Sequence, residues 1–177
     1  KKYNLKIFKI DKLDIHGGSN RYFIKRKSNP KKIHKSVAHQ RKAEISYGLK
    51  NYKTYKKFAS RVKRSRIMLK NIFKKLKNKN KTIIGYGATA KSTTILNYCN
   101  INNKTIDFFL DTTTDKQNKY TPGTKIPILK YSGIDRSKID YIFLGAWNFK
   151  NEIFKKEKKF IKNGGKFIIH TPYPKII

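Results

Sequence analysis

The stretch TIIGYGATAKSTTILNY, residues 82–98, indicates the fold of this chain more strongly than any other segment. A short β-branched run leads into a glycine-rich turn, and apolar residues at helical spacing follow the turn. Gly85 and Gly87 can adopt φ > 0 and allow another group to approach the backbone, which a Cβ would prevent. A helix that starts after such a turn offers unpaired N–H groups and the positive end of its dipole to a phosphate. The stretch therefore predicts the strand–turn–helix entrance of a nucleotide-binding α/β unit, in the variant Gly-x-Gly-x-x-Ala.

Apolar and amphipathic segments alternate along the rest of the second half of the chain. Residues 106–110 and 140–146 are apolar runs typical of strands buried between helices, and residues 148–162 form an amphipathic helical pattern ended by Gly164 and Gly165. Strands that alternate with helices favour a mostly parallel sheet with right-handed crossovers. The chain is therefore predicted to be α/β and Rossmann-like, with helices flanking the sheet.

Three further segments complete the predicted sheet. Residues 111–124 form an unusually long polar loop, and structureless loops of this length tend to be functional. Residues 126–128 contain Pro127, which cannot donate a ladder hydrogen bond, so they predict a short strand at the edge of the sheet. Residues 166–170 predict the strand that closes the sheet.

The first eighty residues predict a strand pair and a helical linker ahead of the Rossmann-like part. Residues 5–10 and 20–25 alternate loosely between apolar and polar side chains and are joined through a Gly-Gly turn. A helix over residues 36–44 is expected to stop at Gly48. A second helix over residues 52–77 carries apolar residues at i, i+3 and i+4, with Lys and Arg on its other face.

The chain is strongly basic: 44 Lys and Arg residues against 10 Asp and Glu residues give a formal net charge of +34. The lysines fall on every predicted element, so the charge fits a compositional bias of the genome as well as a surface that binds a polyanion. A single cysteine excludes an intrachain disulfide framework and a cysteine-rich zinc site within the segment. The sequence contains no run of ~18 apolar residues, which a membrane-spanning helix would need. It also shows no signal peptide, so we expect a cytoplasmic location.

Several short motifs follow one another along nearly the whole chain. They are HGGS at 16–19, GYGATAK at 85–91 with LNY at 96–98, Asp111 followed by Lys116 and Gln117, PGTKIP at 122–127, and Trp147 with Asn148. In this order and spacing they resemble the C-terminal part of the S-adenosylmethionine-dependent C-methyltransferases that act on nucleotide-linked deoxysugars. Each motif alone is a weak signal, whereas the set in order is specific.

The resemblance implies an enzyme of three parts: an N-terminal cysteine-rich zinc module, a central methyltransferase domain that binds S-adenosylmethionine, and a C-terminal Rossmann-like domain that holds a nucleotide-diphosphate sugar. Residues 1–30 would be the closing strands of a truncated methyltransferase domain, residues 31–80 a helical connector, and residues 81–177 the nucleotide-sugar-binding domain. The chain opens on Lys1 and not on Met, which fits a piece cut from a longer protein. S-adenosylmethionine and zinc would then be bound by missing N-terminal parts, which are also the expected partners. The segment alone is expected to be inactive and to bind no specific nucleic acid.

One histidine is implied as the catalytic base. In the family, the histidine of the HGGS motif acts near the sugar carbon, which points to His16. Methyl transfer to carbon needs a base that removes a proton alpha to a carbonyl, and imidazole can serve at neutral pH. Gly17 and Gly18 would allow a substrate carbon to come close. From the residues alone, His16 is also a plausible turn residue.

A second set of residues is predicted to bind the nucleotide-sugar, at and near the carboxyl ends of the strands, where ligands of open α/β sheets gather. The set is Gly85, Tyr86, Gly87, Ala88, Lys91, Asn97, Asp111, Lys116, Trp147 and Asn148. Structural roles stay open for several of them: Lys91 as a solvated surface residue, Asp111 as a turn former, and Asn148 as the N-cap of the next helix. No metal-binding residues are predicted.

Two other functions fit parts of the sequence. An NAD(P)-type dinucleotide-binding module would also carry Gly-x-Gly-x-x-Ala and an acid such as Asp111, although no set of hydride-transfer residues is visible. A basic protein that binds nucleic acid or an anionic surface would need its lysines gathered on one face.

Overall fold

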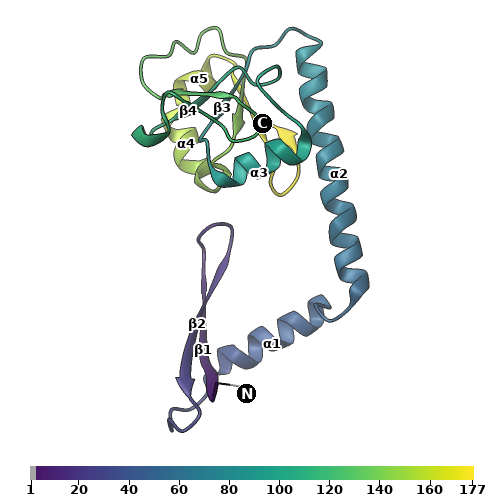
Figure 1. Cartoon of the computed structure of the whole chain (residues 1–177), viewed down its shortest axis with the longest axis vertical. Coiled ribbons are helices and arrows are strands. Elements are labelled where there is room, and N and C mark those ends of the chain that lie inside the picture. The colour runs from purple at the N-terminus through teal and green to yellow at the C-terminus, as the bar shows by residue number, and fades with distance from the viewer. Residues whose placement is uncertain (1–2) are drawn as a thin grey trace. The chain divides into compact units, whose positions relative to one another are not determined.

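The computed structural model describes residues 3–177, which form two compact units, the first ending at Ser60 and the second beginning at Arg61. Figure 1 gives the labels of the helices and strands used below. The long helix α2 (Tyr52–Lys77) starts in the first unit, and its residues from Arg61 onward belong to the second. Each unit is described by itself.

The first unit contains the predicted strand pair and the predicted first helix. Strands β1 (Leu5–Leu13) and β2 (Ser19–Arg26) pair antiparallel, with a register irregularity between Ile7 and Lys9. Helix α1 (Lys35–Tyr47) is joined to β1 by the Ile10 N–H, which donates to the Ser36 hydroxyl at 3.0 Å. The helix ends at Gly48, which takes the left-handed conformation with φ 77° and donates its N–H to carbonyls of the last turn. The helix stop predicted at Gly48 is thus confirmed.

The second unit is built on one seven-stranded sheet with the strand order β5-β6-β4-β3-β7-β8-β9. Its strands are β3 (Ile83–Tyr86), β4 (Phe109–Asp111), β5 (Lys119–Tyr120), β6 (Pro127–Lys130), β7 (Tyr141–Leu144), β8 (Lys166–Ile169) and β9 (Lys175–Ile176). The strands from β6 to β8 pair in parallel, and only the two-residue strands β5 and β9 pair antiparallel. The predicted α/β, mostly parallel, Rossmann-like fold is confirmed.

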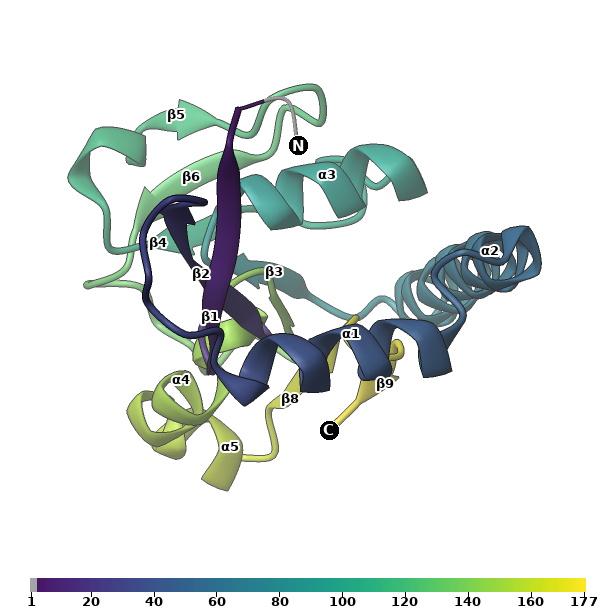
Figure 2. The same ribbon diagram turned by 90° about the horizontal axis from the view of Figure 1, so that it is seen from below.

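Helices cover both faces of this sheet. On one face, Leu69 and Phe73 of α2 and Leu96 of α3 (Ala90–Cys99) pack with alternate strand residues such as Phe109 and Phe143. On the other face, α4 (Lys150–Lys156) and α5 (Lys158–Lys162) bury apolar residues against the remaining strand positions. Figure 2 shows α3 on one side of the strands and the α4–α5 pair on the other. Buried strands that are apolar on both faces require this three-layer arrangement.

Three details differ from the sequence-based expectations. Strand β6 is not at the edge, because β5 pairs with it and Pro127 is only its first residue, where the missing N–H is tolerated. The segment 111–124 is not a plain loop, since it contains β5 and the 3₁₀ turn η1 (Thr114–Lys116). Strand β8 does not close the sheet, because the chain returns and adds β9 beside it.

The predicted helix over residues 148–162 is broken into three pieces. It begins as the 3₁₀ turn η2 (Trp147–Phe149), continues as α4 and, after a break at Glu157, as α5. Glu157 is only 3% exposed, and its carboxylate accepts an ion pair from Arg136, with Nε and Oε2 2.8 Å apart. A buried carboxylate needs such a partner. The helix is therefore interrupted at the residue that forms a buried ion pair, which the amphipathic pattern does not reveal.

Candidate functional site

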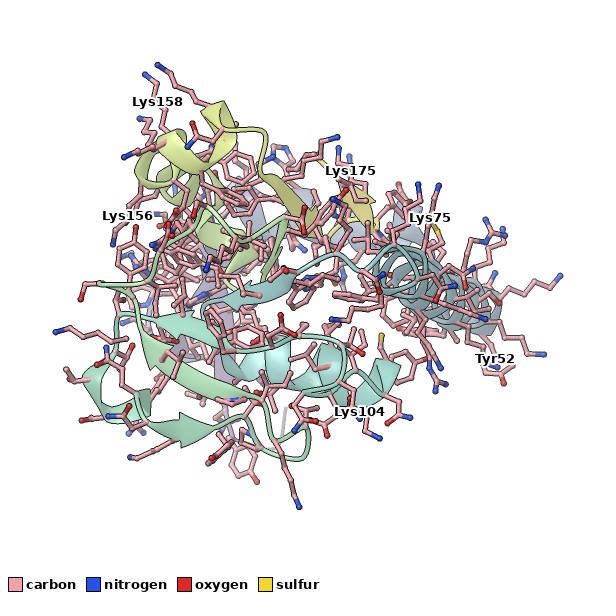
Figure 3. All side chains as sticks on the ribbon, turned by 90° about the horizontal axis from the view of Figure 1, so that it is seen from above. Tyr52, Lys75, Lys104, Lys156, Lys158 and Lys175 are labelled. Atoms are coloured by element: carbon pink, nitrogen blue, oxygen red, sulfur yellow. The ribbon has the colours of Figure 1, made fainter. Side chains whose placement is uncertain are left out.

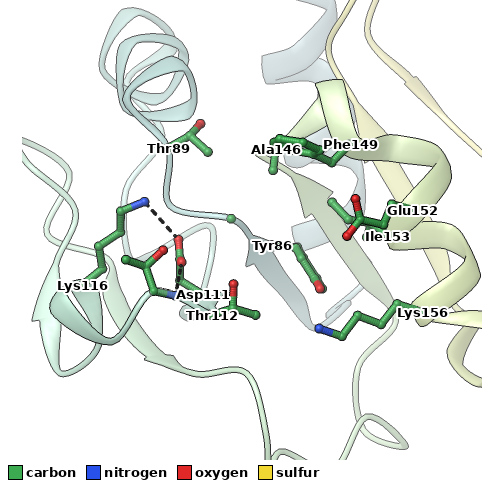
Figure 4. A pocket seen from close by; sticks show the side chains of 12 residues that line it. Tyr86, Thr89, Asp111, Thr112, Lys116, Ala146, Phe149, Glu152, Ile153 and Lys156 are labelled. Carbon is green, nitrogen blue, oxygen red and sulfur yellow. Dashed lines mark hydrogen bonds and ion pairs between the residues drawn. The ribbon is translucent and has the colours of Figure 1, made fainter. Parts of the chain in front are cut away.

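A cavity of about 330 Å³ opens at the carboxyl ends of β3, β4 and β7, and we call it the carboxyl-edge pocket (Figure 4). Its lining residues are Tyr86, Gly87, Thr89, Asp111, Thr112, Thr113, Lys116, Ala146, Phe149, Glu152, Ile153 and Lys156. From β3 the chain builds the sheet toward β4 and β6, and then crosses over to place β7 on the other side of β3. This reversal of strand order creates the crevice in which open α/β sheets bind ligands.

The two glycines of the turn after β3 serve different purposes. Gly87 has φ +79°, as the turn requires, and a Cβ on it would lie 2.6 Å from the Cβ of Ala146. Gly85 is an ordinary strand residue without positive φ, and a Cβ on it would enter the ring of Phe109. The expectation that Gly85 takes φ > 0 is therefore wrong, because its missing side chain makes room for a core phenylalanine.

A further glycine, Gly145 at the end of β7, was not singled out by the sequence. A Cβ there would meet the carbonyl oxygen of Gly87 and, at 2.9 Å, the Cβ of Ser92. The turns after β3 and β7 are thus packed backbone against backbone. This close packing fixes the floor of the pocket between the two strands.

The start of α3 is capped by its own side chains. Thr89 is the N-cap, and its hydroxyl accepts from the Ser92 N–H at 3.1 Å while the Ser92 hydroxyl accepts from the Thr89 N–H at 2.9 Å. This capping box satisfies one helix donor and leaves the N–H groups of the first turn near the pocket. Thr89 therefore orders the glycine turn as well as lining the pocket.

Asp111 connects the glycine turn to the loop after β4. Its Oδ2 accepts from the Ala88 N–H and its Oδ1 from the Thr113 N–H, both at 2.8 Å. The Lys116 Nζ lies 3.5 Å from Oδ2, and the side chain of Asp111 is only 7% exposed. The structure thus brings together three predicted residues, Asp111, Ala88 and Lys116, through a carboxylate that holds the protein's own backbone.

Tyr86 lies on the floor of the pocket and is linked to a buried polar network. Its ring packs edge-on against Tyr131, with centroids 5.5 Å apart. Burial raises the pKa of Tyr86 well above its ordinary value, so the phenol stays protonated and able to donate. The pKa of Tyr131 is raised first by burial and then by the nearby carboxylate of Glu157, the partner of Arg136.

Six predicted residues lie outside the lining of the pocket: Gly85, Ala88, Lys91, Asn97, Trp147 and Asn148. The Lys91 Nζ lies 5.5 Å from the centre of the Trp147 ring, so the structure brings these two together. Asn97 donates to the carbonyl of Pro122 at 3.0 Å and so ties α3 to the turn between β5 and β6.

Asn148, the last of the predicted residues, lies within η2 and caps no helix. Ala146 is the N-cap of η2 and Phe149 that of α4, and neither has a side-chain capping bond. The N-cap role considered for Asn148 is therefore wrong, because α4 begins at Lys150 with Phe149 as its N-cap, one residue later than the pattern placed it.

His16 belongs to the first unit, in the turn between β1 and β2. It adopts φ +53°, and Gly17 and Gly18 follow with φ +87° and +109°. The Gly18 N–H donates to the carbonyl of Ile15 at 2.9 Å and closes the turn. The sequence HGGS thus forms a tight turn whose left-handed residues need glycine or a tolerant side chain.

The sequence did not single out the wall of the pocket that α4 provides. Phe149, Glu152, Ile153 and Lys156 lie at i, i+3, i+4 and i+7 and present one helical face to the pocket. Their spacing after a strand that ends at the carboxyl edge was a usable signal. Thr112 and Thr113, which follow Asp111 directly, could have been found in the same way.

No group of three or more His, Cys, Asp or Glu side chains in residues 3–177 could hold a metal ion. None of the helices described is long and apolar enough to cross a membrane.

Comparison with known proteins places the chain in a family. The family model described as C-methyltransferase C-terminal domain matches residues 14–172. The chain is also 34% identical over 175 residues to the C-methyltransferase NovU of Streptomyces niveus, and this match covers 99% of the chain but 42% of the relative. The chain thus spans less than half the length of the curated relative it matches. By both comparisons, it belongs to the C-methyltransferase C-terminal domain family.

Proposed function

We propose that this chain is the C-terminal, substrate-binding part of an S-adenosylmethionine-dependent C-methyltransferase, and that its carboxyl-edge pocket binds a nucleotide-linked sugar. The observation that carries the proposal is the position of the pocket at the reversal of strand order, beside a glycine turn and the start of α3. A diphosphate fits there because Lys116 lines the same cavity as the glycine turn.

The proposal assigns the remaining chemistry to other regions. S-adenosylmethionine would supply the methyl group from a methyltransferase domain outside these residues, and a zinc module would also lie there. Residues 1–30 would complete that domain, and residues 31–80 would connect it to residues 81–177. His16 would remove the proton alpha to the sugar carbonyl, because methyl transfer to carbon needs a carbanion-like nucleophile. A cytoplasmic location is part of the same proposal.

The NAD(P)-type alternative is less well supported by the geometry. In dinucleotide folds, an acid after the second strand accepts from ribose hydroxyls. Here Asp111 occupies that position, but both carboxylate oxygens already hold backbone N–H groups and little of the side chain is exposed. The pocket therefore lacks an acid free for ribose at the position where an NAD-binding fold has one.

The nucleic-acid alternative has no particular surface to support it. Lys75 projects from α2, Lys104 from the turn after α3, Lys158 from α5 and Lys175 from β9, all in the second unit (Figure 3). This spread fits a compositional bias, and it also attracts any anionic ligand over a long range.

Titration calorimetry on the chain, with UDP, TDP and NAD⁺ as ligands, tests the proposal. We expect both diphosphates to bind more tightly than NAD⁺, and Lys116→Gln to weaken them about tenfold through loss of a charged phosphate contact. Lys119→Gln removes the same charge from β5, outside the pocket lining, and should leave both affinities within about twofold. Tighter binding of NAD⁺, or equal losses in the two variants, would contradict the proposal.

A further inference from the structure

Most acidic side chains of this basic chain have a partner within the structure. Those with a hydrogen bond or ion pair are Asp11, Glu44, Asp107, Asp111, Asp135, Asp140 and Glu157. No hydrogen bond or ion pair from residues 3–177 reaches the carboxylates of Asp14, Asp115 and Glu152, and of these three only Glu152 lines the carboxyl-edge pocket, where it is exposed. With 44 basic residues in the chain, a carboxylate left without a cationic partner beside a cavity calls for an explanation.

The surroundings of Glu152 have the composition of a site for a polyhydroxylated ring. Phe149 and Ile153 flank Glu152 on the pocket-facing side of α4, and Lys156 follows one turn later. Figure 4 shows the Glu152 carboxylate on the α4 wall, across the cavity from Asp111 and Lys116. An apolar ring and an aliphatic side chain can cover the C–H groups of a sugar, while a carboxylate, which only accepts, takes hydrogen bonds from its hydroxyls.

The opposite wall is suited to a different part of a ligand. Lys116, the glycine turn and the start of α3 lie there, and the Asp111 carboxylate is engaged by the Ala88 and Thr113 N–H groups. That wall supplies donors for phosphate, and its exposed acceptors are the neutral hydroxyls of Thr112 and Thr113, whereas its one carboxylate, that of Asp111, is already engaged. The two walls therefore divide the cavity into a phosphate side and a hydroxyl side.

We propose that the α4 wall is the sugar subsite of the carboxyl-edge pocket, in which Glu152 accepts hydrogen bonds from hydroxyl groups of the hexose of a nucleotide-linked sugar. This inference rests on the proposed function, since it needs the diphosphate to lie on the Lys116 side. Glu152 acts in binding and specificity: it selects hexoses that keep a hydroxyl toward α4. A neutral side chain at this position would accept more weakly, because hydrogen bonds to ionised groups are the stronger ones.

The test compares two ligands on the same chain, UDP and UDP-glucose, by titration calorimetry. The ratio of their dissociation constants isolates the contribution of the hexose, because the general attraction of anions to the basic chain affects both. Glu152→Gln should shift this ratio about tenfold against UDP-glucose, and Glu152→Ala at least as much. Glu44→Gln, which removes the same charge from α1 in the first unit, should leave the ratio unchanged.

The outcomes separate this inference from the proposed function. If the parent binds neither ligand, or Lys116→Gln has no effect on either, the proposed function fails. If the parent binds both and Glu152→Gln leaves the ratio unchanged, Glu152 does not contact the hexose and the inference is overturned. If Glu152→Gln weakened the binding of UDP and of UDP-glucose equally, the inference would also be overturned. Glu152 would then contact the part that the two ligands share, such as the ribose, and not the hexose. Trp147 fluorescence, the single tryptophan signal of the chain, checks that the Lys116 and Glu152 variants are folded in the second unit, and far-UV circular dichroism checks Glu44→Gln.

Discussion

The two units of this chain use similar amphipathic patterns with very different results. In the second unit, two clusters of apolar residues lie on the two faces of the sheet, and Phe109, Phe143 and Leu96 have no exposed surface. In the first unit, Ile10 is the only residue among those described that is buried. The difference arises from layers: a sheet covered by helices on both faces encloses side chains, whereas a strand pair with one helix does not.

The apolar side chains left over in the first unit lie together on the strand pair. Ile7 and Ile24 are directly opposite one another across the two strands, and Tyr22 lies two residues from Ile24 on the same face. Ile24 is 56% exposed and Tyr22 46%. A face of this kind is costly in water and fits the proposal that these strands complete another domain. The comparison thus predicts that the two units respond differently to the same kind of mutation.

The largest expected difference is for the loss of a phenylalanine ring. Phe143 is fully buried and contacts the rings of Phe73 and Phe109, so Phe143→Ala should lower the free energy of unfolding of the second unit by about 3–5 kcal/mol. Phe58→Ala removes the same ring from a side chain of the first unit that is 57% exposed, and should cost no more than about 0.5 kcal/mol. Urea unfolding followed by Trp147 fluorescence measures the loss for Phe143→Ala, and far-UV circular dichroism of the same samples, which also reports the helices of the first unit, measures the loss for Phe58→Ala. Similar losses would contradict the contrast between the units.

Much of the fold was predictable because local chemistry and tertiary structure agree. The turn at Gly87, the helix stop at Gly48 and the parallel strands all follow from residue types that leave the backbone few choices. The break at Glu157 was not predictable, because an acidic residue in an amphipathic pattern is expected at the surface. Its burial depends on Arg136, which is distant in the sequence and comes close only in the fold. Strands β5 and β9 were missed because two-residue strands carry no periodic pattern.

The site was predictable only where it follows the strands. Tyr86, Gly87, Asp111 and Lys116 lie at the carboxyl edge, and the structure places all four in one pocket. The α4 wall was overlooked because its residues are spread over two turns of a helix whose start the sequence misplaced. Asp111 illustrates a different limit: its position was found, while its engagement with the backbone at Ala88 and Thr113 depends on the fold.

The next largest effect concerns pH and His170, a buried residue of the second unit. Its ring stacks on Phe143, its Nδ1 has no hydrogen-bond partner among the described residues, and burial lowers its pKa from 6.5 to about 4. Because the folded pKa lies below the unfolded one, the unfolded state binds the extra proton between these two values. The stability of the second unit should therefore be full above pH 6.5 and fall by about 3 kcal/mol as the pH drops to 4.

Two variants isolate this contribution. His170→Leu keeps an apolar side chain at the buried position and should remove most of the decline between pH 6.5 and 4, while His39→Leu, on the exposed side of α1, should leave it as in the parent. The pKa of Asp140 is lowered mainly by its hydrogen bond with Lys81, so that carboxylate loses its stabilising effect only at more acidic pH. Urea midpoints measured at half-unit steps of pH give the curves. An unchanged decline in His170→Leu would assign the acid sensitivity to other groups.

The smallest expected effect separates crowding from backbone strain at glycines. Gly85→Ala places a methyl group against the ring of Phe109 at an ordinary strand conformation, so its cost comes from overpacking and should be about 1–3 kcal/mol. Gly133→Ala, in the same unit, has φ +84° and open space around the new methyl group, and should cost only the strain of about 1 kcal/mol. Gly18→Ala has the same open space at φ +109°, but it lies in the first unit and should leave the Trp147 unfolding midpoint unchanged. If Gly85→Ala costs less than Gly133→Ala, the core of the second unit can yield to an added methyl group. The core of the second unit would then be less tightly packed than its fully buried rings indicate. The contrast with the first unit, whose side chains are mostly exposed, would be weaker.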